Sequence, residues 1–122
     1  MKTTKKQFET FCLECYKWQE FFNLMDWELC IVHEAIEDRG DVTFYPEEGI
    51  AVIRFTTDWT GDKAPLTDEI VKRVAFHEIT ELFLGRLSFM AGNRYSVSEE
   101  GINEERHRII RTLENRLFEM SE

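Results

Sequence analysis

Three short segments with the two-residue periodicity of β-strands lie between segments with the three- and four-residue periodicity of helices. The strand segments are residues 26–35, 42–45 and 50–56, and turn-forming residues separate them. The helical segments are residues 4–23, residues 68–90 and a last segment that Ser96 or Ser98 can cap and that ends near residue 120. This order predicts an α+β fold: an N-terminal helix, a three-stranded mainly antiparallel sheet, then two further helices.

The chain is long enough to bury a substantial core. It has 122 residues, of which 43% are apolar and 13% aromatic, so we expect one domain that spans residues 1–122. Three strands in succession, with no helix between them, favour an antiparallel meander. Trp27, at the start of the first strand segment, is expected in the core.

The charge of the chain argues against two classes of partner. Fifteen basic and 24 acidic residues give a net charge of −9, which repels nucleic-acid phosphates and anionic membrane surfaces. No apolar run approaches the roughly 20 residues of a membrane span. The three cysteines are an odd number and no signal peptide is evident, so we expect a cytoplasmic location. Cys12 and Cys15 lie within a predicted helix and are interpreted as packed thiols.

The segment His77-Glu78-Ile79-Thr80-Glu81 is the candidate for chemistry. On a helix, His77 and Glu81 share one face about 6 Å apart along the axis, so one metal ion can contact both. Glu78 points about 100° away around the helix, where it can act as a general base toward a water molecule. The pattern is that of H-E-x-x-H with the second histidine replaced by a glutamate, which is also a competent zinc ligand.

The surroundings of this segment strengthen the metal hypothesis. Apolar residues 74–76 precede it and residues 82–84 follow it, and charged side chains there are costly unless they are paired or bind a ligand. Two alternatives stay open. The five-residue pattern also arises by chance on acidic helices, and its charges can be explained by salt bridges to Arg73 or Arg86.

Further stretches of sequence accompany the motif: residues 73–78, 82–87, 94–95 and 104–115, with residues 27–29, 51–55 and 57–59 upstream. Together they resemble the small metallopeptidases encoded by tailed phages and prophages. The resemblance covers most of the chain and implies a minimal zincin-like domain, in which the helix after the motif helix supplies a third metal ligand. It also implies a zinc-dependent hydrolase that cleaves a peptide or protein substrate, with Glu78 as the catalytic base.

The chain departs from this family at Glu81, where most members have the second histidine. Some members have a glutamate on the last helix, six residues before a leucine, and the corresponding position before Leu113 is His107. The resemblance therefore implies the ligand set His77, Glu81 and His107, which leaves one position for water. Glu104 or Glu105 is an alternative third ligand, and His107 also fits a surface histidine among acidic residues.

The remaining expectations concern the ion, the substrate and competing functions. Zinc is expected, although the same donors serve manganese and iron. An extended substrate is expected along an edge strand, taken as residues 50–56. Tyr95 is a candidate for contact with a substrate oxyanion or for packing, and His33 is expected to be structural. The competing hypotheses are a catalytically inactive zincin-like protein that binds a host factor through its acidic surface, and a metal-free interaction module.

Overall fold

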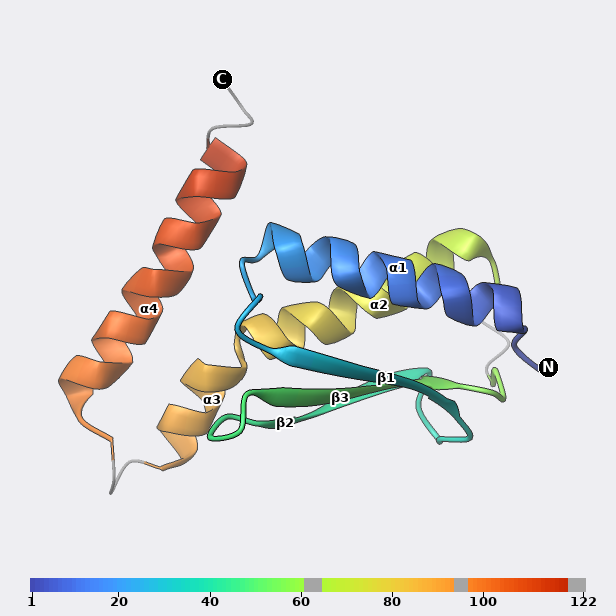
Figure 1. Cartoon of the computed structure of the whole chain (residues 1–122), viewed down its shortest axis with the longest axis horizontal. Coiled ribbons are helices and arrows are strands. Elements are labelled where there is room, and N and C mark those ends of the chain that lie inside the picture. The colour runs from blue at the N-terminus through green and yellow to red at the C-terminus, as the bar shows by residue number, and fades with distance from the viewer. Residues whose placement is uncertain (61–64, 94–96, 119–122) are drawn as a thin grey trace.

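The computed structural model describes residues 1–60, 65–93 and 97–118. The elements in chain order are α1 (Lys5–Phe21), β1 (Glu28–Glu34), β2 (Gly40–Tyr45), β3 (Ile50–Thr56), α2 (Asp68–Phe83), α3 (Gly85–Gly92) and α4 (Glu99–Leu113), followed by a short π-helical turn, η1 (Glu114–Phe118). Figure 1 shows this arrangement. The predicted α+β class is confirmed, with the N-terminal helix before the sheet and the other helices after it.

The sheet is mixed, and its strand order is β1-β3-β2. β1 runs parallel to β3, whereas β2 runs antiparallel to it (Figure 1). The predicted meander is therefore wrong, and residues 50–56 form the central strand rather than an edge. The physical reason is the composition of β3: Ala51, Ile53 and Phe55 are fully buried, and the middle of the sheet gives such a strand its greatest burial.

The connection between β1 and β2 crosses the end of β3. Its backbone is held by Thr56, whose N–H donates to the carbonyl of Arg39 at 3.0 Å and whose hydroxyl donates to the carbonyl of Ile36 at 3.2 Å. These bonds place the start of β2 beside the end of β3. The two strands that are neighbours in sequence thus lie at opposite edges of the sheet.

Helices α1 and α2 cover one face of the sheet (Figure 1). Phe11 of α1 stacks on Phe55 of β3 with ring centroids 4.7 Å apart, and Phe22 stacks on Phe83 of α2 at 4.5 Å. Trp27 is buried in this core, as the sequence predicted. These contacts determine the rotation of α2 about its axis, and therefore which of its side chains face away from the core.

The starts of the helices follow their capping residues. Thr4 forms a capping box with Gln7, Thr67 accepts a hydrogen bond from the N–H of Ile70, and Ser98 accepts one from the N–H of Gly101. Local sequence thus sets where α1, α2 and α4 begin.

The single helix predicted for residues 68–90 is wrong, because α2 ends at Phe83 and α3 begins at Gly85. A Cβ atom on Gly85 would lie 3.0 Å from the ring of Phe44, so the junction between the helices packs closely against β2. Glycine is also a poor helix former, and its position here favours a break over continuation.

Helix α4 leans away from the pair α1 and α2 (Figure 1). Its apolar side faces them, with Ile109 buried and Leu113 packed against the core. Among the helices in the described ranges, none has the length and apolar character needed to cross a membrane.

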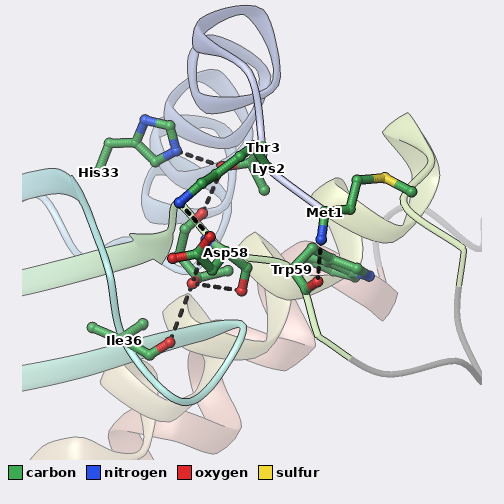
Figure 2. A network of polar contacts seen from close by, with 8 residues as sticks. Met1, Lys2, Thr3, His33, Ile36, Asp58 and Trp59 are labelled. Atoms are coloured by element: carbon green, nitrogen blue, oxygen red, sulfur yellow. Dashed lines mark hydrogen bonds and ion pairs between the residues drawn. The ribbon is translucent and has the colours of Figure 1, made fainter.

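Figure 2 shows how the N-terminal residues are fastened to the ends of the strands. The hydroxyl of Thr3 donates to the carbonyl of Thr56 at 2.7 Å, and it lies 2.6 Å from Nε2 of His33. Because the hydroxyl has a single proton, Nε2 must carry the hydrogen of the second bond. The His33 ring also stacks on Phe8 at 4.8 Å and on Phe55 at 5.7 Å, which accords with the structural role expected for it.

We expect Thr3→Val to lower the free energy of unfolding by about 1–3 kcal/mol, because it preserves shape while leaving His33 and the Thr56 carbonyl without their partner. Urea denaturation measures the change. The matched control is Thr10→Val, which removes only an exposed hydroxyl bond within α1 and should change stability by less than about 0.5 kcal/mol. Equal stabilities of the two variants would contradict the role of Thr3.

Candidate metal centre

An open cleft of about 900 Å³ separates α2 from the connection between β1 and β2. Residues 37–42 and Thr60 line one wall, and α2 residues 70, 73, 74, 77, 78 and 81 line the other. The cleft therefore contains all three members of the motif on α2. The sequence did not indicate the opposite wall.

One donor atom from each of His77, Glu78 and Glu81 lies within 4.8 Å of the other two. Nε2 of His77 and Oε1 of Glu81 are 3.8 Å apart, as expected for residues one helical turn apart. Their side chains are 68% and 54% exposed, whereas Glu78 is only 4% exposed. Within the described ranges, this is the one group of three or more such residues with metal-ligand spacing.

Glu78 is the unusual member of the group. Its Oε2 atom is buried and has no hydrogen-bond partner among the described residues, which is costly for a carboxyl group. Burial, the neighbouring carboxylate of Glu81 and a side-chain hydrogen bond with it, and the charges of Asp41 and Asp38 together raise the pKa of Glu78 to about 8, with burial the largest cause. Without a cation, this carboxyl is largely protonated near neutral pH. A divalent ion would offer the missing partner.

Gly40 allows the two walls of the cleft to approach each other. A Cβ atom at this position would lie 2.8 Å from Cγ1 of Val74 and 3.4 Å from Cγ of Glu78. A side chain there would force α2 away from the start of β2. In the sequence Gly40 indicates only a turn, since its contact with α2 is not local.

Asp41 is held in the same wall by Arg54 of β3. The guanidinium donates two hydrogen bonds to the carboxylate, from Nε at 2.8 Å and from a terminal nitrogen at 2.5 Å. The same carboxylate raises the pKa of Arg54. The pair therefore leaves Asp41 less able to serve as a further metal ligand.

The structure does not bring His107 to His77 and Glu81. Nδ1 of His107 donates to the carbonyl of Asn103 at 2.8 Å, and the ring lies at the exposed surface of α4. The reason is the rotation of α4: Ile109 points into the protein, and a residue two positions away points about 200° around the helix.

The alternative third ligands on α4 are also outside the group. Glu105 is buried, and its Oε1 atom accepts two hydrogen bonds from Arg108, at 2.6 and 2.9 Å. Glu104 lies beside His107 on the surface. The structure therefore brings no α4 residue to His77 and Glu81 among the described residues, and a third ligand from α4 stays a prediction. Tyr95 lies outside the described residues.

The cysteines take no part in this site. Cys15 is buried in α1, and burial raises the pKa of its thiol. Burial also raises the pKa of Cys12, with a contribution from Glu9. Both thiols are held in the protonated form, which fits the expectation of packed thiols.

Comparison with protein-family models, with curated proteins and with solved structures finds no match for this chain. The fold and the site define an α+β protein that carries a His-Glu-Glu group in a cleft. Its function is therefore inferred from the chemistry of these side chains.

We expect the stability of the metal-free protein to fall as pH rises from about 4.5 to about 8. The pKa of Glu78 is about 8 when folded against an ordinary value of 4.5, so within this window the folded state binds more protons than the unfolded state. Above the window the loss is complete. Urea denaturation in a chelator at several pH values should give a flatter profile for Glu78→Gln than for the wild type. Glu69→Gln, an exposed substitution on the same helix, should leave the profile unchanged, and parallel profiles for all three proteins would refute the burial effect.

We expect Gly40→Ala to destabilise the protein by about 1–3 kcal/mol, because the new methyl group overlaps Val74. Displacement of Glu78 by the new methyl group should also reduce the affinity of the protein for zinc, which isothermal titration calorimetry measures. Gly92→Ala is the matched control, since a methyl group there meets nothing within 4 Å and replaces a poor helix former. Equal effects of the two substitutions would show that the approach at Gly40 is not tight.

Proposed function

We propose that this chain binds a divalent metal ion, zinc in the first instance, at His77 and Glu81, with Glu78 beside the ion as general base, and acts as a metal-dependent hydrolase of peptide or protein substrates. The observation that carries the proposal is the buried, unpartnered Oε2 of Glu78 within a group of three donors. A carboxyl group in this position is costly to the fold. Its cost is explained if it serves a cation or a reaction.

The donor set fits a divalent ion. One imidazole and two carboxylates are ligands that zinc, manganese and iron accept. A cation between Glu78 and Glu81 would offset the repulsion that raises the pKa of Glu78. The two ligands, His77 and Glu81, both come from α2, so part of the coordination sphere would stay open on the cleft side, as catalytic sites require.

A bound zinc ion would supply Lewis-acid polarisation of a substrate carbonyl and would make water a better nucleophile. Glu78 is suited to the accompanying proton transfer. Beside a bound cation its carboxylate would be ionised and could accept a proton from water and return it to the leaving amine. Its burial also keeps the carboxyl in one orientation toward the cleft.

β2 is the strand along which we place the substrate. It is an edge strand, and its residues Gly40, Asp41 and Val42 line the cleft opposite His77. An extended peptide can add to such an edge by backbone hydrogen bonds, which would bring its carbonyl groups past the motif. This assignment replaces residues 50–56, which form the central strand.

A second candidate function is binding without catalysis. It is favoured by the exposure of His77 and Glu81 and by the position of His107, which leaves the group without a ligand from α4. In this case the chain would bind a host factor through its surface, which is acidic because the net charge is −9. Fold alone does not decide between the two functions.

We expect protein purified without chelators to hold about one zinc, manganese or iron ion per chain, as elemental analysis measures. Glu81→Gln should weaken zinc binding about tenfold or more in calorimetry, since it removes a donor, whereas Glu69→Gln on the exposed side of α2 should not. Absence of metal, together with no gain in thermal stability on added zinc, would refute the metal centre.

Turnover separates the two candidate functions. We expect the wild type with zinc to cleave members of a mixed peptide library and Glu78→Gln to lose cleavage by about 10²-fold or more, because the general base is removed. Mass spectrometry of the library measures both. Stoichiometric metal without cleavage, and with binding partners unaffected by Glu78→Gln, would favour the non-catalytic function.

A further inference from the structure

A second hollow lies outside the metal cleft, between α1, α2 and α4. It has a volume of about 550 Å³, and no polar atom of the described residues contributes to its surface. The side chains that form it include Trp18, Phe21, Phe76, Phe83, Ile109 and Leu117. Thr80 also borders it, but the hydroxyl of Thr80 donates to the carbonyl of Phe76 at 2.7 Å and is therefore satisfied within the helix.

The apolar side chains around this hollow are incompletely covered. Phe76 is 41% exposed, Leu84 42% and Leu117 52%, although all three border the same space. Water within a hollow of this kind finds no hydrogen-bond partner on the walls. Contiguous exposed apolar surface with a concave shape is typical of a binding site for an apolar ligand.

Side chains of both charges lie beside the hollow. The carboxylate of Glu14 accepts a hydrogen bond from Nε1 of Trp18 at 3.1 Å. Nζ of Lys17 lies 4.9 Å from the centre of the Trp18 ring, and its ion pair with Glu14 is long, at 3.9 Å. Arg116 donates to the carbonyl of Glu20 at 3.1 Å, and within the described ranges no carboxylate forms an ion pair with it. The carbonyl of Glu20 is bonded to the backbone nitrogen of Phe21, so the Arg116 guanidinium lies beside the backbone of a residue that lines the hollow.

We propose that this hollow binds a free fatty acid, with the alkyl chain between the three helices and the carboxylate at Arg116. The volume lies within the range of roughly 300–1,000 Å³ that is usual for small-molecule sites. A guanidinium has five N–H donors, so one bond to a carbonyl leaves others for a carboxylate. The apolar walls and the Arg116 guanidinium together match an aliphatic monocarboxylate, and neither depends on a metal at His77.

The first test separates the head group from the chain. Calorimetry should detect binding of monomeric dodecanoate to the full-length protein. We expect Arg116→Gln to weaken dodecanoate binding about tenfold, because one charge-assisted hydrogen bond is lost. Dodecanol has no carboxylate, so its binding should change by less than about twofold. Arg106→Gln, an exposed arginine of α4 away from the hollow, is the control and should change neither. Equal losses for dodecanoate and dodecanol in Arg116→Gln would overturn the assignment of the carboxylate.

The second test concerns the hollow itself. Leu117→Glu places a charge at the half-exposed edge of the hollow and should weaken both ligands by about tenfold or more, whereas Leu13→Glu, a more exposed leucine of α1, should not. Circular dichroism verifies that both variants are folded. Failure of the wild type to bind either ligand would overturn the proposal. Concentration-dependent dimerisation that Leu117→Glu abolishes would also overturn it, since a second copy of the chain would then occupy the hollow.

Discussion

The close contact between Gly40 and α2 is the constraint on which the candidate site depends. With no side chain at Gly40, the start of β2 approaches Val74 and Glu78, and this contact covers the Glu78 carboxyl while it leaves His77 and Glu81 facing the cleft. The same approach brings the edge of β2 into reach of the motif. One glycine thus contributes to the burial of Glu78, which raises its pKa, and to the shape of the cleft.

The elements of the fold could be predicted from the sequence to the extent that they depend on local interactions. Capping by Thr4, Thr67 and Ser98 is local, and the starts of α1, α2 and α4 follow from it. Strand order is not local. Periodicity identifies β3 as a strand but not its place, which is decided by how much of its apolar surface the sheet and the two helices can cover. The break at Gly85 has the same character, because it depends on the ring of Phe44 from another element.

The candidate site also has local features, which could be predicted from the sequence, and non-local features, which could not. The spacing of His77 and Glu81 within one helix is sufficient to bring them together, and they lie 3.8 Å apart. The burial of Glu78 depends on Gly40, which lies 38 positions earlier in the chain, and no periodicity of α2 indicates it. His107 was assigned from a resemblance that includes no information on the rotation of α4. That rotation follows from the packing of Ile109, which turns His107 toward solvent.

Helix α2 accounts for the separation of the two surfaces for which we propose functions. Val71, Ala75 and Ile79 occupy its core side and are fully buried, which leaves the rest of its circumference for other contacts. His77 and Glu81 face the cleft, whereas Phe76 and Thr80, each one residue earlier, border the apolar hollow. Adjacent residues on a helix differ by about 100° in direction, so a polar surface and an apolar surface can follow one another along the same two turns. Neighbouring residues on α2 can therefore lie in a polar cleft and in an apolar hollow without a break in the helix. The only requirement is that core contacts fix the rotation of α2 about its axis.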